Sequence, residues 1–271
     1  MITVLGASGF VGSSLVKKLK ETDREHFAPG RDEALPQENL GNIIYCIGFT
    51  ADFRSMPFET VSAHVCKLLD VVRDHEFDSL TYLSSARVYE GQLGVAREED
   101  PFEVAPLNLS NLYNISKAMG ESLSFACGKN VRVVRLSNVY GDDFTSQNFL
   151  STIIKQAVST KRVTVQTSPD SEKDYVSVHD VVDALIKIVT SGTRSIYNVA
   201  SGVNVSHQRL LERISELTGC HVDFIPEAPR VSYPPISIER MRSEFGFRPS
   251  NLLEDLSKMV NSFRSRYEVS T

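Results

Sequence analysis

Cysteine is scarce in this sequence, and the few thiols follow no pattern. Four cysteines occur among 271 residues, without a C-x-x-C motif and without the spacing that metal ligands show. This excludes a disulfide framework of the secreted type and a metal site built on cysteine. We expect four reduced and mostly buried thiols, as in a cytosolic protein.

Basic stretches and long apolar segments are also missing. Lys and Arg number 29 against 34 Asp and Glu, so the formal net charge is −5, which makes nucleic acid a poor candidate as a partner. No apolar run approaches the length that spans a membrane. The first strand begins almost at Met1, which leaves no room for a signal peptide. We therefore expect a cytoplasmic globular protein without a membrane partner.

What is present is an alternation of short apolar runs and amphipathic helical patterns. Such alternation is typical of a doubly wound parallel sheet, so the predicted fold class is α/β, of the Rossmann type. The expected strands are residues 2–5, 26–28, 43–48, 79–83, 131–136, 162–166, 195–199 and 222–225. The expected helices include residues 61–74, 112–121, 147–159, 179–189, 206–217, 238–245 and 252–267.

A glycine-rich turn follows the first strand and precedes a helical pattern. Gly6, Gly9 and Gly12 would allow the tight turn, the close approach of a diphosphate and the packing of helix on strand. The helix N-terminus would present free N–H groups to the phosphates. This context favours dinucleotide binding over a glycine-rich turn without a ligand.

The end of the second strand bears on the choice of cofactor. An NAD site usually ends this strand with an acid that binds the ribose 2′-hydroxyl, whereas an arginine accommodates a 2′-phosphate. Arg31 follows the strand and no acid stands at its end, which favours NADP(H) and leaves NAD(H) open. In the alternative, Arg31 is solvated and Asp32 or Glu33 turns toward the ribose.

The third strand arrives early in the chain. Residues 31–42 are too few for the helix and strand that would normally intervene, so we infer that one βα unit is reduced to a loop. Gly48 would let the end of this strand pass close to the cofactor.

Three polar side chains point to acid–base chemistry. Tyr113 and Lys117 share a helix face, and a cation beside a phenol lowers its pKa toward neutral pH. Ser85 lies at the carboxyl end of the strand at residues 79–83, where a hydroxyl can stabilise a developing oxyanion. The alternatives are an ordinary surface pair and a serine that only caps the next turn.

Taken together, these motifs resemble the extended short-chain dehydrogenase/reductase family, which includes NDP-sugar epimerases, dehydratases and ketoreductases. The resemblance covers nearly the whole chain. It rests on G-A-S-G-F-V-G at residues 6–12, S-S-A-R-V-Y at 84–89, Y-N-I-S-K at 113–117, R-L-S-N-V-Y-G at 135–141, D-Y-V-S-V-H-D at 174–180 and F-G-F-R-P at 245–249.

The resemblance implies a role for each matching residue. Ser85 would be the catalytic hydroxyl, Tyr113 the general acid/base, and Lys117 the cation that lowers its pKa and binds the nicotinamide ribose. Ser85, Ala86 and Asn138 would contact the substrate, with Asn138 near its diphosphate. The residues expected at the cofactor are Gly6, Ser8, Gly9, Phe10, Val11, Gly12, Arg31, Cys46, Ile47, Gly48, Tyr113 and Lys117.

The residues after Ser85 bear on which of the family's reactions this protein catalyses. The family's 4,6-dehydratases carry an Asp-Glu pair that supplies the acid and base for eliminating water. Ala86 and Arg87 stand at these two positions and cannot supply them. The resemblance therefore implies reduction of a keto group, at C4, of a nucleotide-activated deoxysugar by NADPH. An NAD-dependent 4-epimerase, a reductase of a non-sugar ketone, and a non-catalytic dinucleotide sensor or scaffold remain alternatives.

The domain organisation follows from the same pattern. We expect residues 1–142 to form the dinucleotide-binding domain, to which residues 174–200 return. Residues 143–173 and 201–271 would form a small, mainly helical substrate lobe. Arg230 and Arg240 are candidates for the arginine that contacts the distal phosphate, and the resemblance implies a homodimer formed through the Tyr113 helix.

Overall fold

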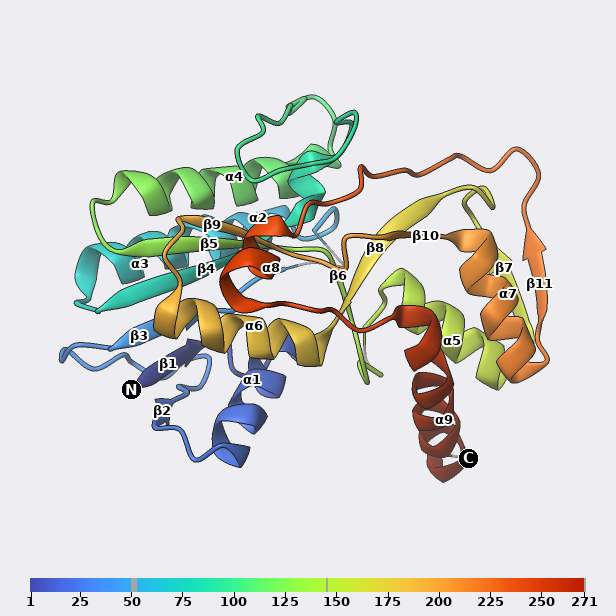
Figure 1. The fold of residues 1–271 in the computed structure, drawn as a ribbon, viewed down its shortest axis with the longest axis horizontal. Coiled ribbons are helices and arrows are strands. Elements are labelled where there is room, and N and C mark those ends of the chain that lie inside the picture. The colour runs from blue at the N-terminus through green and yellow to red at the C-terminus, as the bar shows by residue number, and fades with distance from the viewer. Residues whose placement is uncertain (50–52, 145, 271) are drawn as a thin grey trace.

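The computed structural model describes residues 1–49, 53–144 and 146–270, and it confirms the parallel Rossmann-like sheet (Figure 1). Six parallel strands lie in the order β2-β1-β3-β4-β5-β9. Their bounds are His26–Phe27 for β2, Ile2–Leu5 for β1, Asn42–Tyr45 for β3, Ser79–Ser85 for β4, Val131–Leu136 for β5 and Ile196–Val199 for β9.

Helices cover both faces of this sheet, which explains why its central strands are buried along most of their length. Helices α1 (Phe10–Glu21) and α6 (Val178–Ser191) pack together on one face. The opposite face carries α3 (Lys67–Asp74) and α4 (Asn111–Ala126) (Figure 1). Val4 and Ile44 have no exposed surface, because the two layers of helices enclose the central strands.

The early arrival of β3 is explained by a missing unit. Residues 28–41 form neither a helix nor a strand and run directly from β2 to β3. Since β2 and β3 pair with β1 on opposite sides, the chain reverses direction across the sheet at β1. In open α/β sheets, ligands bind outside the carboxyl ends of the strands at such a switch point.

The helix predicted at residues 61–74 is interrupted by a wider turn. Helix α2 (Pro57–Val61) continues into a π-helical turn, η1 (Ser62–Cys66), before α3 begins. Two buried tyrosine hydroxyls donate to backbone oxygens of this turn, Tyr45 to Ala63 at 2.7 Å and Tyr82 to His64 at 3.2 Å. These donors from neighbouring strands bond to the widened turn, which the local sequence pattern does not reveal.

A second lobe packs beside the carboxyl ends of the sheet. It holds a three-stranded sheet of β6 (Asn138–Tyr140), β8 (Glu172–Ser177) and β10 (Asn204–Ser206), and a pair of β7 (Arg162–Val165) with β11 (His221–Phe224). Three helices share a core with these strands: α5 (Phe149–Ser159), α7 (His207–Thr218) and α9 (Leu252–Ser270). The three-residue strands β6 and β10 were too short to predict from pattern.

One segment of the predicted lobe belongs elsewhere. Helix α8 (Glu239–Phe245) packs against β9, and Ile236, Met241 and Phe247 join the core of the large sheet. Residues 236–247 therefore return to the dinucleotide-binding part, contrary to the expected boundary at residue 201. Their apolar side chains cover the edge strand β9, a tertiary contact without a local signal.

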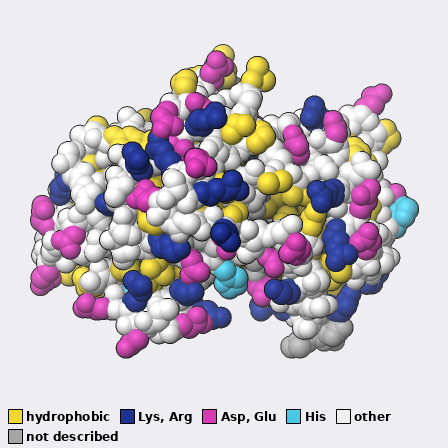
Figure 2. Space-filling view, in the orientation of Figure 1, with side chains coloured by type: hydrophobic (Ala, Val, Ile, Leu, Met, Phe, Trp, Pro, Cys, Tyr) yellow, Lys and Arg dark blue, Asp and Glu magenta, His cyan; other side chains and the backbone are white. Residues whose placement is uncertain are grey.

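Two further expectations concern the burial of the cysteines and the absence of a membrane-spanning segment. The thiols are free, but only Cys220 is buried; Cys66 is exposed, and Cys46 and Cys127 are half-buried, so the expectation of mostly buried cysteines was wrong. Among the described residues, no helix combines the length and apolar character that a membrane span requires. Figure 2 shows charged side chains of both signs spread over the visible face.

Candidate active site

A cleft of about 490 Å³ lies between the carboxyl ends of the sheet strands and the second lobe. The first helix, the ends of β3 and β4, and α4 supply one wall, and the lobe supplies the other. Lining residues include Gly9, Phe10, Val11, Cys46, Ile47, Gly48, Ser85, Ala86, Arg87, Tyr113, Lys117, Asn138, Phe149, Lys173 and Tyr233. Side chains predicted from distant motifs are thus brought together here.

The glycine turn between β1 and α1 has a geometry that only glycine permits. Gly6 has a φ of +88°, and a Cβ on Gly12 would lie 2.2 Å from the Gly6 carbonyl oxygen. Gly9 is the N-cap of α1 and supplies no side-chain cap, so the N–H groups of the first turn remain available. Such a helix N-terminus, opening into a cleft, suits the diphosphate of a dinucleotide.

The residues expected at the cofactor divide into three groups. Gly9, Phe10, Val11 and the stretch 46–48 line the cleft, and their contact with a cofactor stays a prediction. Gly6 and Gly12 shape the turn from behind it. Ser8 and Arg31 are exposed and do not line the cleft, although Ser8 precedes Gly9 within the glycine turn.

The turn after β2 contains an acid as well as the predicted base. The Glu33 carboxylate accepts a hydrogen bond from the Gly30 backbone N–H at 2.8 Å. Arg31 lies exposed between these two residues. The turn after β2 therefore contains both the carboxylate of Glu33 and the guanidinium of Arg31.

Two consecutive serines at the end of β4 have different partners. Ser84 is buried and donates to the Glu121 carboxylate at 2.5 Å. Ser85 faces the cleft, accepts from the backbone N–H of Arg87 at 3.2 Å and acts to lower the pKa of the Tyr113 phenol. Ser85 thus caps the short 3₁₀ turn η2 (Ala86–Tyr89), as in the alternative reading, and also contacts the expected acid/base.

Tyr113 is placed by α4 with only 6% of its surface exposed. Burial raises the pKa of its phenol, because the phenolate loses hydration. The Ser85 hydrogen bond and the positive charge of Arg87 act in the opposite direction and lower that pKa. A proton can therefore be held at the phenol oxygen and released when a nearby charge or hydrogen bond favours the phenolate.

Lys117 lies one turn along α4 but is directed elsewhere. Its ammonium donates to the Leu83 carbonyl at 2.8 Å, and burial lowers its pKa to about 7. In this structure the positive charge that acts to lower the Tyr113 pKa is that of Arg87, and the role expected of Lys117 stays a prediction. The α4 geometry points the lysine toward the end of β4, within reach of the cleft.

Sequence reasoning missed His64, which packs behind Tyr113. Its ring meets the phenol edge-on, with centroids 5.2 Å apart. Nδ1 lies 2.8 Å from the Ser116 hydroxyl, and Nε2 accepts from the Phe49 N–H at 3.1 Å. Burial lowers the pKa of His64 to about 2, so the ring is neutral. A lone histidine in an amphipathic stretch gives no sequence signal that its ring packs against Tyr113.

The lobe side of the cleft supplies polar and aromatic groups. Asn138 lines the cleft, as predicted, and donates to the Asp174 carbonyl at 2.8 Å. The Lys173 ammonium lies 5.4 Å from the centroid of the Phe149 ring. Burial and the nearby Arg87 charge both lower the pKa of Lys173. This wall can therefore accept an anionic ligand.

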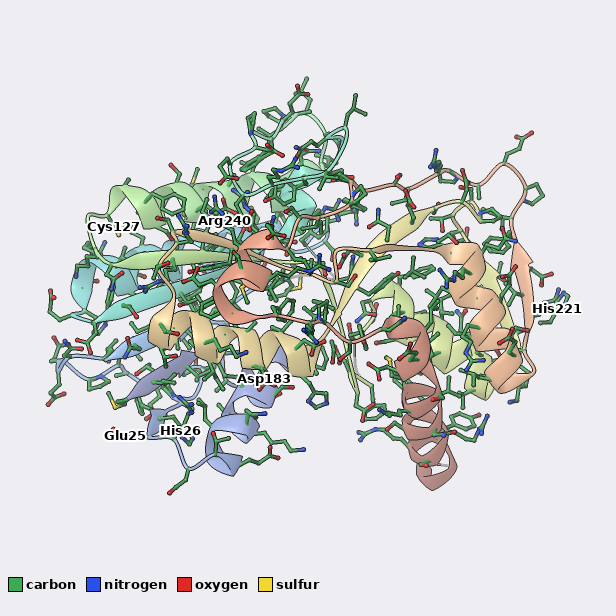
Figure 3. All side chains as sticks on the ribbon, in the orientation of Figure 1. Glu25, His26, Cys127, Asp183, His221 and Arg240 are labelled. Carbon is green, nitrogen blue, oxygen red and sulfur yellow. The ribbon has the colours of Figure 1, made fainter. Side chains whose placement is uncertain are left out.

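The two arginines proposed for the distal phosphate lie outside this wall. Arg240 on α8 pairs with Glu98 at 3.6 Å and donates to the Ile196 carbonyl at 2.9 Å (Figure 3). Arg230 pairs with Asp170 at 3.1 Å and is exposed. Neither lines the cleft, because both are engaged by carboxylates of other segments.

A metal site has no support in the described part of the chain. Among residues 1–49, 53–144 and 146–270, no three His, Cys, Asp or Glu side chains come together in a way that could hold a metal ion. The chemistry available from the described side chains is proton transfer and hydrogen bonding to a ligand.

Known proteins with similar sequences act on nucleotide sugars. UDP-glucuronic acid decarboxylase 3 of Arabidopsis thaliana is 24% identical over 99% of this chain and 90% of its own length. The dTDP-4-dehydro-6-deoxy-D-allose reductase of a Streptomyces species is 24% identical over 97% of this chain and 96% of its own length. MoeE5, solved in complex with UDP-glucose and NAD, has the same fold, with a TM-score of 0.83, 22% identity and coverage of 98% of this chain and 99% of MoeE5.

The family of this protein is assigned by a family model, because single relatives of low identity do not assign it. The model of the NAD dependent epimerase/dehydratase family matches residues 39–200, the segment that carries β3, Ser85, Tyr113 and Lys117. Because this match spans more than half of the chain, the protein belongs to the NAD dependent epimerase/dehydratase family.

Proposed function

We propose that this protein reduces a keto group, at C4, of a nucleotide-activated deoxysugar. The observation that carries the proposal is that Ser85 and Tyr113 line the same cleft, beside the glycine turn, and that Ser85 acts to lower the pKa of the Tyr113 phenol. A hydroxyl and a phenol in contact can bind one carbonyl oxygen together. Reduction of that carbonyl group requires only a hydride and a proton.

A nicotinamide dinucleotide would supply the hydride, and the residues of this chain would do the rest. The N-terminus of α1 would hold the diphosphate through its free N–H groups. Ser85 would donate to the carbonyl oxygen and stabilise the developing alkoxide. Tyr113 would then transfer its phenol proton to that alkoxide, and Lys117 would bind the nicotinamide ribose.

The residues after Ser85 support reduction over elimination of water. Ala86 has no acidic or basic group, and Arg87 is a permanent cation, so the pair lacks the acid and base that dehydration needs. Substrate contacts are proposed for Ser85, Ala86 and Asn138, which line one cleft. The Streptomyces reductase, similar along nearly its whole length, supports the same reaction class.

For the cofactor we propose NADP(H), with NAD(H) as the alternative. Arg31 favours a 2′-phosphate if its exposed side chain folds over the adenosine ribose. The proposal is tested with the purified, nucleotide-free protein, NADPH or NADH, and a dTDP-4-keto-6-deoxyhexose. We expect equimolar loss of absorbance of the reduced cofactor and formation of the C4 alcohol, faster with NADPH. Absence of turnover with either cofactor would contradict the proposal.

A second candidate is an NAD-dependent 4-epimerase using the same residues. The Glu33 carboxylate beside Gly30 favours it, because an acid at this place binds an unphosphorylated ribose. An epimerase would convert UDP-glucose continuously without net consumption of cofactor. A non-catalytic sensor on this fold would bind a dinucleotide and turn over neither substrate.

We further propose a cytoplasmic homodimer that forms through α4 and α3. Met119 and Phe125 on α4 are 53% and 45% exposed, and Leu69 on α3 is 40% exposed. A shared interface would remove these apolar side chains from water. Light scattering at micromolar concentration should give twice the mass of one chain, and Met119→Glu should return it to that of the monomer.

A further inference from the structure

We propose that Arg87 is a positioning residue for the acid/base Tyr113, whose phenolate form its guanidinium stabilises. This inference rests on the proposed function only in taking Tyr113 as the acid/base. It assigns a role to a residue that otherwise serves only to exclude dehydration. It also explains how proton transfer proceeds although the Lys117 ammonium is directed at a backbone carbonyl.

The guanidinium of Arg87 is held against the aromatic face of the site. Its central carbon lies 5.9 Å from the centroid of the Tyr113 ring and 5.1 Å from that of Phe53. The centroids of the two rings are 5.3 Å apart, so the cation lies beside both rings at a similar distance. The backbone N–H of Arg87 also donates to the Ser85 hydroxyl. One residue thus contacts both members of the reacting pair.

The charge of Arg87 is only partly compensated. Its one ion-pair partner among the described residues is Glu90, with Nη2 and Oε2 3.5 Å apart. The Arg87 Nε is buried and has no hydrogen-bond partner in that part of the chain. A loosely paired cation in a partly desolvated cleft exerts a strong field on a neighbouring phenol. The Arg87 charge acts to lower the pKa of two phenols, Tyr113 and Tyr233, and only Tyr113 is the proposed acid/base.

Other charged groups around the phenol lie farther back or are neutral. On α4 itself, Lys117 is paired by hydrogen bond with the Leu83 carbonyl. From η1, the His64 ring faces the phenol and is neutral because burial lowers its pKa to about 2. From the loop before α8, the Tyr233 phenol is influenced by the same Arg87 charge. Of these three groups only Lys117 is a cation, and the Leu83 carbonyl to which it donates carries no counter-charge. The guanidinium that lies against the Tyr113 ring is that of Arg87.

Two further cations flank Arg87 itself. Lys173 of β8 faces it across the cleft, and mutual repulsion lowers the pKa of the lysine. Arg54 lies on the Phe53 ring at 4.5 Å and is anchored to Ser110 at 3.1 Å. Arg54 therefore contacts Phe53 as Arg87 does but, in the described part of the chain, does not lie over the Tyr113 ring, which makes it a matched control.

The proposed step moves one proton and leaves one charge. In the reduction, the O–H bond of Tyr113 breaks, its proton passes to the alkoxide oxygen, and the negative charge appears on the phenol oxygen. Arg87 stabilises that charge where it forms, which makes the phenol a stronger acid. In the reverse direction the same field favours the phenolate that removes the proton.

The test is a direct titration of residue 113. The full chain carries 3,5-difluorotyrosine at this position, a stronger acid than tyrosine, and its ¹⁹F resonance is followed against pH. Arg87→Met should raise the pKa of this phenol by about one unit or more, since an opposite charge at 4–6 Å shifts a pKa by that order. Arg87→Lys should restore most of the shift, and Arg54→Met should leave the titration unchanged.

A second variant keeps the test decisive if Arg87→Met does not fold. Glu90→Gln removes the anion that partly compensates Arg87 and should lower the phenol's pKa, the opposite direction. Titration curves that do not move in Arg87→Met, or that move equally in Arg54→Met, would overturn the proposal. If only Glu90→Gln folds, an unchanged or raised pKa overturns it. The titration needs no substrate, so failure of the proposed reduction would leave this result intact.

Discussion

Glu121 and Arg135 form a buried ion pair beneath the candidate active site. Arg135 Nη2 lies 2.6 Å from Glu121 Oε2, and the two side chains are only 4% and 5% exposed. Ser84 donates to the same carboxylate, and the Tyr89 hydroxyl accepts from the guanidinium at 2.7 Å. This network joins α4, β4 and β5, the elements that carry Tyr113 and Ser85, so it sets the distance between them.

Removing one member of this pair should destabilise the fold strongly. Glu121→Gln leaves the Arg135 charge buried without a counter-charge, which costs about 3–5 kcal/mol. Urea unfolding would measure the loss. As controls, Glu121→Leu combined with Arg135→Met should lose less than the single variant, and Glu216→Gln at an exposed ion pair should not move the midpoint. A single variant as stable as the wild type would refute the role of the network.

The glycine turn should tolerate no side chain at residue 12. A methyl group on Gly12 would lie 2.2 Å from the Gly6 carbonyl oxygen, so the turn must open and α1 must shift. We expect Gly12→Ala to weaken NADPH binding at least about 10-fold, the effect of losing about 1.4 kcal/mol of binding free energy. Fluorescence titration measures it. Gly30→Ala is the control, because its added Cβ has space of 3.7 Å, and it should bind normally.

Loss of the Tyr113 hydroxyl should abolish proton transfer but keep the fold. Tyr113→Phe removes the acid that protonates the alkoxide, and general acid catalysis of this kind contributes about 10²–10⁴-fold. We expect kcat to fall by that factor while the Kd for NADPH stays the same. Tyr140→Phe, which removes a hydroxyl bonded to Asp255 in the lobe, should retain activity. Full turnover in Tyr113→Phe would exclude this residue as the acid.

Buried Lys117 should make stability depend on pH in a defined direction. Its pKa of about 7 lies below the ordinary 10.5, so between these values the folded protein holds fewer protons than the unfolded chain. Stability of the wild type relative to Lys117→Met should therefore rise with pH across this window, by at most about 1.4 kcal/mol per unit.

Chemical unfolding at pH 7, 8.5 and 10 would follow this difference between the two proteins. A difference that stays constant over the window would mean that Lys117 keeps an ordinary pKa in the folded state.

Much of the candidate site could be predicted because its motifs are local and the fold fixes where they meet. The glycine turn, Ser85 and Tyr113 each follow or precede a recognisable strand or helix, and carboxyl ends of parallel strands share one edge. The shortened connection before β3 was also evident, since 31–42 is too short for another helix and strand. The positions followed from chain order and spacing, and the roles of Ser85 and Tyr113 followed from the resemblance of their motifs to a known family.

What could not be predicted depends on partners far apart in the sequence. Lys117 has the right spacing from Tyr113, yet its direction is set by the Leu83 carbonyl of β4. His64 acquires its place from a π-helical turn that tyrosines of β3 and β4 support. Arg230 and Arg240 had no local signal that carboxylates elsewhere would hold them outside the cleft. In each case a tertiary contact decides which side chain reaches the site.

The most direct measurement of the proposed reaction follows the hydride itself. NADPH that carries deuterium at the transferred C4 position is incubated with the purified protein and a dTDP-4-keto-6-deoxyhexose. Mass spectrometry and NMR of the sugar then locate the isotope. One deuterium at the new carbinol carbon, with one NADPH consumed per product, is the expected result. Product without deuterium, or no product while the cofactor stays reduced, would contradict reduction by this protein.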